Sequence, residues 1–190
     1  MSWSSKLDQI EDDFKSGRLL LSSALILTAN TMRNVAADTV LFWLNRELTG
    51  YEKEDIQSME IQGYAPMLTP RNLNGTWGIE FPSGAFVEKG VTEVLLSHGI
   101  PEIEAALDML FDISIFEKGD YHLMINTIDQ SPCRLALLRL PLPEQDASFM
   151  FNAFGLLNLY FGVGQLLCKM IQTLKECYTG EDLIKLNVRS

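Results

Sequence analysis

The stretch TWGIEFPSGAFVE, residues 76–88, predicts a strand, a tight turn and a second strand that returns beside the first. β-Branched and aromatic residues suit its two arms, and Pro82-Ser83-Gly84 between them are turn formers. The first 50 residues of the chain carry the helical period instead, and no regular alternation of strands and helices follows residues 76–88. Helices, then strands, then a last helix predict an α+β fold with a small antiparallel sheet.

Residues 1–52 are predicted to form a three-helix unit. The first helix ends at Ser16-Gly17. The second, residues 19–32, is apolar nearly all round and is therefore expected to be buried between neighbours. Asn34 suits the N-cap of the third helix, and Gly50 suits its C-cap. The apolar residues of the first and third helices recur at helical spacing: Trp3, Leu7, Ile10 and Phe14, then Ala36, Val40, Trp43, Leu44 and Leu48.

Residues 53–143 are predicted to be a mixed, β-rich part with one helix. Residues 59–64 are expected to form a further strand, and a helix is expected over 101–112 with a proline in its first turn. The alternating segments 121–128 and 134–140 are joined by turn residues and predict an antiparallel hairpin. No internal repeat is evident, so the 190 residues are expected to form a single domain.

Residues 144–190 are predicted to be a long apolar helix, starting near Glu144, and a tail. Residues 147–168 are 22 positions without a formal charge, which is long enough to span a bilayer. A membrane orientation set by the flanking lysines would place residues 1–146 outside the cell, and no export signal is evident. A buried or subunit-interface helix is therefore the preferred interpretation, and a membrane segment is the alternative.

The same helix carries a stripe of small or polar residues of the kind that lets helices pack closely. The stripe consists of Ser148, Asn152, Gly155, Gly162, Gln165 and Lys169. Its remaining surface is more apolar than one side of a small core needs, so part of it is expected to form a symmetric oligomer interface. The candidate interface residues are Phe149, Phe154, Leu157 and Phe161.

The charge balance argues against a nucleic-acid partner. The chain carries 15 Lys and Arg against 25 Asp and Glu, a net charge of −10, and the acidity is spread over both halves. Phosphate backbones would be repelled without a basic patch, and none is evident. Cys133, Cys168 and Cys177 lack zinc-type spacing; Cys168 is expected in the core and Cys177 at the periphery. Without a signal peptide, a cytoplasmic protein with reduced thiols is expected.

No sequence motif for catalysis, for a cofactor or for a metal is evident, so no such site is predicted. The two histidines are His98, in a turn before a helix, and His122, in an alternating strand. We interpret His98 as solvated or capping, and His122 as solvated or paired with a neighbour.

Glu104, Asp108 and Asp112 share one helical face and form a candidate set of ligands for a divalent cation. A run of charges on the outer face of a helix is more commonly just solvated, and this is the preferred interpretation. The same interpretation is given to Glu11-Asp12-Asp13.

The segment WLNRELTGY, residues 43–51, follows LSSAL at 21–25 and Thr28-Ala29, and this pattern resembles the AbiTii domain family. The likeness continues through residues 93–106 and covers about residues 4–110, roughly the first half of the chain. Leu41-Phe42 depart from the small and acidic pair usual in that family. The residues that match its closing signature are Trp43, Glu47, Leu48, Gly50 and Tyr51.

The resemblance implies a role in bacterial abortive infection or related anti-phage defence, and it supplies no catalytic residues. In physical terms the signature predicts structure. Trp43 faces inward, Gly50 caps the helix, Glu47 pairs locally and Tyr51 folds back as an anchor. The other interpretation is that these residues form a surface for a partner or a ligand.

These features together predict a cytoplasmic, homo-oligomeric interaction or regulatory module of a bacterial anti-phage system. It is expected to act by protein–protein contact through the long helix, and not as an enzyme. A protein from the same gene cluster is a further candidate partner. The alternatives are a membrane-directed toxic effector that uses residues 147–168 and a metal-dependent enzyme that uses the acidic set on the helix at 101–112.

Overall fold

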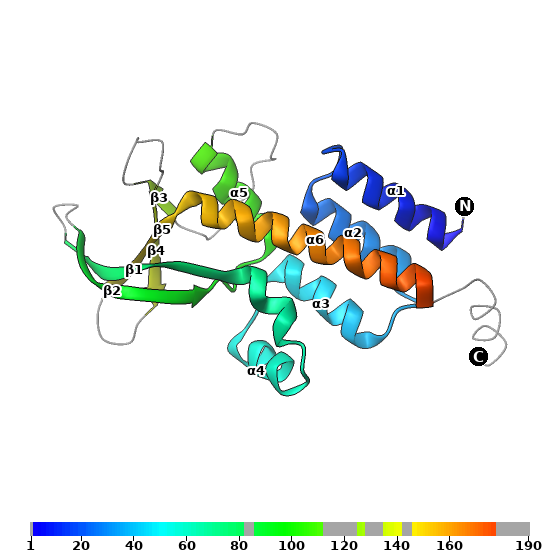
Figure 1. Cartoon of the computed structure of the whole chain (residues 1–190), viewed down its shortest axis with the longest axis horizontal. Helices are drawn as coiled ribbons and strands as arrows, with labels where there is room; N and C mark the ends of the chain where they lie inside the picture. The colour runs from blue at the N-terminus through cyan, green and yellow to red at the C-terminus, as the bar shows by residue number, and fades with distance from the viewer. Residues whose placement is uncertain (1, 82–85, 112–124, 128–134, 142–145, 178–190) are drawn as a thin grey trace. The chain divides into compact units, whose positions relative to one another are not determined.

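The computed structural model describes residues 2–81, 86–111, 125–127, 135–141 and 146–177 (Figure 1). These residues form helices, then an antiparallel sheet, then a long last helix, which confirms the predicted α+β fold. They divide into two compact units. The first contains residues up to Gly50 and those from Val163 onward, and the second contains Tyr51–Gly162. The last helix, α6 (Ala153–Cys177), contributes residues to both.

The first unit contains α1 (Trp3–Lys15), α2 (Leu21–Met32), α3 (Asp38–Thr49) and the second half of α6. Because α2 contacts both α1 and α3, the predicted three-helix unit is confirmed. Its apolar residues meet as the helical spacing requires. Fully buried side chains of this core are Leu7, Leu21, Leu25, Met32, Leu44, Val163, Leu167 and Ile171.

Local capping sets the helix ends of the first unit. The Oγ of Ser2 accepts a hydrogen bond from the N–H of Ser5 (3.2 Å) at the start of α1. The helix ends at Ser16-Gly17 as predicted, with Gly17 in the left-handed region at φ +73°. Gly50, at φ +89°, ends α3, and its N–H donates to the Arg46 carbonyl (2.8 Å). The predicted C-cap is thus confirmed.

Two predictions for this unit are wrong. The N-cap of α3 is Ala37 and not Asn34, because the N–H groups of Val35 and Ala36 still donate to the Met32 carbonyl and continue the turn after α2. Helix α2 is also not buried all round, since Ile26 and Leu27 are 46% and 41% exposed.

The second unit is built around an antiparallel sheet. The predicted pairings are confirmed, because β1 pairs with β2 and β3 pairs with β4. The turns predicted at 82–84 and 129–132 lie outside the described residues. The described strands have the order β2-β1-β5-β4-β3, with β5 between the two hairpins. The strands are β1 (Asn72–Glu80), β2 (Phe86–Leu95), β3 (Ile125–Thr127), β4 (Leu135–Pro141) and β5 (Asp146–Asn152).

The helix predicted over 101–112 is confirmed as α5 (Ile100–Phe111), but the strand predicted at 59–64 is wrong. Those residues end helix α4 (Lys53–Ile61) and form the turn after it. The N–H of Glu52 donates to the Asp55 carboxylate (2.8 Å), and this capping box starts the helix. A 3-10 helix, η1 (Ala65–Arg71), then leads into β1, so this part is less β-rich than predicted.

The long helix predicted from Glu144 is wrong at its start, because strand β5 precedes α6. Phe149 and Phe151 are both buried, and their rings stack with centroids 5.6 Å apart. Burial of two residues that are two positions apart is the pattern expected in a strand. The side chain of Asn152 then accepts a hydrogen bond from the N–H of Phe154 (2.9 Å) where α6 begins. Residues 147–168 are therefore not one continuous helix.

Strands β1 and β5 approach each other closely at Gly75. This residue is paired with Phe151, and a Cβ at Gly75 would lie against the Met150 carbonyl and 2.7 Å from the Phe149 ring. Gly155, near the start of α6, has more room, since a Cβ there would lie 3.5 Å from the Leu73 side chain. Glycine is thus required at position 75 in the sheet, but not at position 155 in α6.

We expect Gly75→Ala to lower the free energy of unfolding by about 1–3 kcal/mol, because the added methyl group overpacks the β1–β5 contact. Gly155→Ala is the matched control, and we expect it to stabilise the protein by up to about 1 kcal/mol, because alanine favours a helix interior. Urea unfolding followed by circular dichroism measures both. Equal stability of the two variants would contradict the close approach at Gly75.

Candidate functional site

The second unit contains a fully buried arginine, Arg71, at the end of η1. Its guanidinium donates hydrogen bonds to the carbonyls of Leu96 (2.9 Å) and His98 (2.7 Å). It also lies over the ring of Tyr51, 4.8 Å from the ring centroid. We call Arg71, Tyr51, Leu96 and His98 the arginine centre. A buried guanidinium is stable only where its donors are bonded, so these groups hold one another in place.

Backbone hydrogen bonds connect the same segments around the arginine centre. The N–H of Tyr51 donates to the Ser97 carbonyl (2.7 Å), and the N–H of Leu96 donates to the Arg71 carbonyl (2.9 Å). Next to them, the N–H of Gly99 donates to the Glu102 carboxylate (3.1 Å) at the start of α5. The arginine centre therefore joins the residue before β1, the end of β2 and the start of α5.

His98, predicted to be solvated or capping, is half-buried beside Arg71. Burial lowers the pKa of its ring below the usual value of 6.5; Glu102 opposes this shift and the charge of Arg71 adds to it. The Nδ1 atom is buried without a hydrogen-bond partner among the described residues. His98 is therefore neutral near pH 7, and charging it would disfavour the fold.

The AbiTii-like residues are largely inside the protein. Trp43 and Glu47 are buried in α3, as are Gly50 and Tyr51 after it, while Leu48 is half-buried. This confirms the inward orientation of Trp43, the capping role of Gly50 and the anchoring of Tyr51. With the four other signature residues buried and Leu48 half-buried, little of the signature lies on the described surface.

The acidic residues of α5 do not form a metal site in the described part of the chain. Glu104 is buried, which corrects the prediction that it lies on a solvated face, and Asp108 is half-buried. Asp112 lies outside the described residues. No group of three His, Cys, Asp or Glu side chains that could hold a metal ion occurs among the residues described. His122 and Cys133 also lie outside them.

A second buried charge, Glu11, lies in the first unit, so the prediction that it is solvated is also wrong. It pairs with Lys15, accepts a hydrogen bond from Gln172 of α6 (3.0 Å) and lies 3.4 Å from the Lys175 ammonium. Burial alone would raise the pKa of Glu11, but these hydrogen bonds and positive charges together hold it below its usual value. The ionised Glu11 therefore ties α1 to α6.

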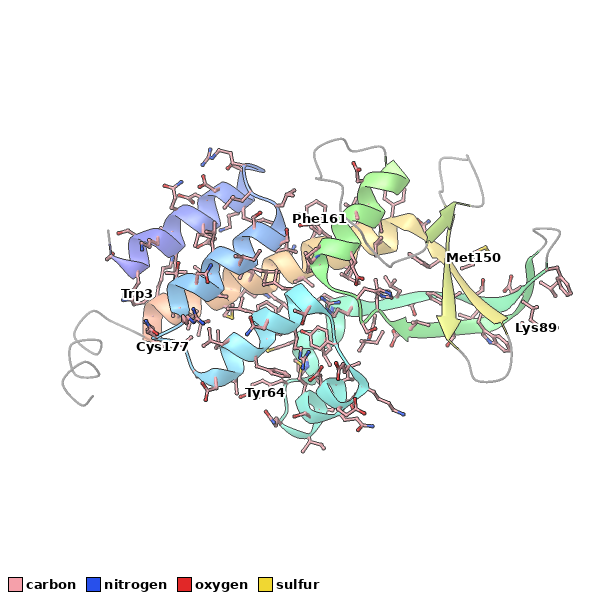
Figure 2. The ribbon with its side chains drawn as sticks, turned by 180° about the vertical axis from the view of Figure 1, so that it is seen from behind. Trp3, Tyr64, Lys89, Met150, Phe161 and Cys177 are labelled. Carbon is pink, nitrogen blue, oxygen red and sulfur yellow. The ribbon has the colours of Figure 1, made fainter. Side chains whose placement is uncertain are left out.

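The two described cysteines lie where the sequence predicts. Cys168 is in the core and burial raises the pKa of its thiol, while Cys177 is exposed at the end of α6 (Figure 2). A raised pKa is the opposite of the lowered pKa that makes a thiol reactive. A catalytic role is not indicated for Cys168.

Helix α6 has one buried and one exposed face. The buried positions recur at helical spacing: Leu156, Leu159, Tyr160, Val163, Gly164, Leu167, Cys168, Ile171 and Leu174. The exposed positions are Phe154, Asn158, Phe161, Gln165, Lys169, Gln172, Thr173, Glu176 and Cys177. Because most of the exposed positions are polar, the pattern is that of a core helix with two aromatic residues on its outer face.

The positions of these residues change the predicted oligomer interface, which consisted of Phe149, Phe154, Leu157 and Phe161. Phe154 and Phe161 are 46% and 52% exposed, and Leu157 between them is half-buried. Figure 2 labels Phe161 on α6. Phe149 is fully buried on β5, which corrects its place in the predicted interface. We call Phe154, Leu157 and Phe161 the aromatic face of α6.

Among the described residues one helix, α6, is long and apolar enough to cross a membrane, over Phe154–Cys177. This is weak evidence, because the core helix of a soluble protein meets the same criterion, and 44% of its most apolar window is buried.

Compared with known proteins, the chain matches no family model, no curated protein and no solved structure. The resemblance to the AbiTii family therefore stays a prediction, and the function has to be inferred from the geometry of this chain.

We expect Arg71→Met to lower the free energy of unfolding by about 3 kcal/mol, because one buried and one partly buried carbonyl lose a charged donor. Arg18→Met is the matched control. Arg18 is exposed and pairs with Asp13 at the surface, so its loss should cost under about 1 kcal/mol. Urea unfolding of the two variants distinguishes them, and similar stabilities would show that the arginine centre contributes little.

His98 should make stability depend on pH. Its folded pKa is lower than its unfolded value of 6.5, so unfolding takes up a proton as the pH falls below that value. The stability that the neutral ring provides is therefore present above pH 6.5 and is lost as the pH falls below 6.5 toward the lower folded pKa. We expect His98→Gln to flatten this part of a urea-midpoint profile. An unchanged slope would mean that other groups cause it.

Proposed function

We propose that this protein is a non-enzymatic interaction module of a bacterial anti-phage, abortive-infection-like system. It acts in the cytoplasm as a homo-oligomer, and the aromatic face of α6 makes the protein–protein contact. A protein encoded in the same gene cluster is a further candidate partner. The AbiTii-like signature supports the biological role, and the aromatic face supports the mechanism.

The exposure of Phe154 and Phe161 is the observation that carries the mechanism. The two rings lie seven residues apart on one helix face, each about half exposed, with Leu157 between them. Aromatic side chains are enriched at protein interfaces because they bury a large area at a small cost in conformational entropy. Partly buried rings on a rigid helix are therefore well suited to anchor a partner.

Two of the buried charged groups, Arg71 and Glu11, support a binding role over a catalytic one. Arg71 donates hydrogen bonds to backbone carbonyls. Glu11 forms ion pairs with Lys15 and Lys175 and accepts a hydrogen bond from Gln172. Catalysis needs charged groups that converge on a space for a substrate. These two groups are instead engaged by the protein's own chain, so their environment serves stability.

A membrane-directed effector is the second candidate, and the length and composition of α6 favour it. It would use Phe154–Cys177, since residues 147–152 belong to β5. The polar outer positions of α6 and the ion pairs of Lys175 with Asp8 and Glu11 favour the interaction module instead. Protein in the washed membrane pellet after phage challenge would favour the effector, whereas protein that stays soluble favours the module.

Deletion of this gene from its native cluster is expected to restore phage plaques, which tests the defence role directly. The double variant Phe154→Asp/Phe161→Asp should restore plaques as well, because two charges would prevent burial of the aromatic face. Light scattering of the purified protein should show an oligomer for the unaltered chain and a monomer for this variant.

Ile61→Asp is the matched control, because Ile61 is 86% exposed and lies at the end of α4, away from the aromatic face in sequence. It should keep both protection and the oligomer. Unchanged plating after gene deletion across a broad phage panel would reject the defence role. A monomeric unaltered chain at micromolar concentration would reject self-association.

A further inference from the structure

The first unit has a hollow between α1 and α2 that none of the preceding roles uses. Its volume is about 400 Å³, within the range of small-molecule sites. Each helix contributes one apolar side chain and two polar ones. The lining residues are Lys6, Gln9 and Ile10 from α1 and Leu27, Asn30 and Thr31 from α2.

The apolar part of this hollow consists of Ile10 and Leu27. Ile10 is buried, whereas Leu27 is 41% exposed even though it lies in a folded helix. An apolar molecule placed against Leu27 would remove that surface from water, at about 25 cal/mol per Å². The hollow therefore favours a ligand with an apolar body.

Lys6 is the one charged residue among the six that line the hollow. The ammonium of Lys6 has no ion-pair partner among the described residues, whereas Lys15, Arg18 and Lys175 are all paired with carboxylates. Asn30 and Thr31 add an amide and a hydroxyl on the facing helix. The side chain of Gln9 is already hydrogen-bonded to Asp13. The free charge in the hollow is therefore positive, in a chain whose net charge is −10.

We propose that this hollow binds a small, soluble amphiphilic anion, with its apolar body against Ile10 and Leu27 and its carboxylate at Lys6. The charge complementarity with Lys6 selects the anion, and the exposed Leu27 selects the apolar body. The inference does not depend on the proposed function, since it uses other residues than the aromatic face. For a ligand of about eight heavy atoms, a Kd on the order of 1 mM is expected.

The test uses the full-length protein and three probes of one chain length: hexanoate, hexanol and hexylamine. Amide chemical shifts in two-dimensional NMR spectra at pH 7 and low salt give the affinities. Hexanoate should bind about three-fold more tightly than hexanol, the size expected for an exposed charge pair, and hexylamine should bind most weakly. The shifts should concentrate on the lining residues of the hollow.

Two variants separate the parts of the site. Lys6→Gln should remove the preference for hexanoate over hexanol and leave hexanol binding unchanged, while Leu27→Ala should weaken both. Lys53→Gln is the matched control, because Lys53 is an exposed lysine of α4 in the other unit, and it should keep the preference. Both lysines are exposed, so these changes leave the fold intact.

Equal affinities for the three probes, shifts away from the hollow, or a preference that survives Lys6→Gln would each overturn the proposal. Co-sedimentation with vesicles containing phosphatidylglycerol tests a membrane as the source of the anion. Sedimentation that Lys6→Gln abolishes would replace the soluble ligand with a lipid surface, and protein that stays in the supernatant would support the soluble ligand.

Discussion

The buried guanidinium of Arg71 is the constraint on which the arrangement of the second unit depends. Moving an arginine from water into a protein interior costs several kcal/mol unless its donors find partners. The carbonyls of Leu96 and His98 and the face of Tyr51 provide them, from segments far apart in the sequence. A shift of any of these segments would weaken the support of a buried charge, so the junctions between η1, β1, β2 and α5 are fixed together.

The features predicted correctly from the sequence are those set by local chemistry. The apolar period of Leu7 and Ile10, the cap at Gly50 and the two hairpin pairings depend on residues close together in the chain. Strand β5 was not predicted, because an apolar helix follows Phe149 and Phe151 directly in the sequence. The strand period of two and the helix period of 3.6 residues cannot be separated in such a continuous apolar run. The buried Arg71 could not be predicted, because its carbonyl partners lie 25 and 27 residues away and nothing in the local sequence marks them.

In the candidate sites, too, the features set by local sequence could be predicted and those set by distant residues could not. Exposure of Phe161 and burial of Cys168 follow from their places on α6, whereas the burial of Glu11 arises only when Gln172 and Lys175 come beside it. The outer surface of the described chain offers apolar contact at the aromatic face and a positively charged hollow between α1 and α2. Both features lie on helices, and the function proposed above and the ligand proposed for the hollow are built on them.

The single helix that contributes to both compact units also governs when the chain can fold. The first 50 residues emerge from the ribosome early, but their core includes Val163, Leu167 and Ile171 of α6. More than a hundred residues separate them, and the chain is extended at about 5–20 residues per second. The first three helices therefore wait for several seconds with an unfilled core during synthesis. In that interval the apolar side chains that pack against α6 in the folded protein lack that partner.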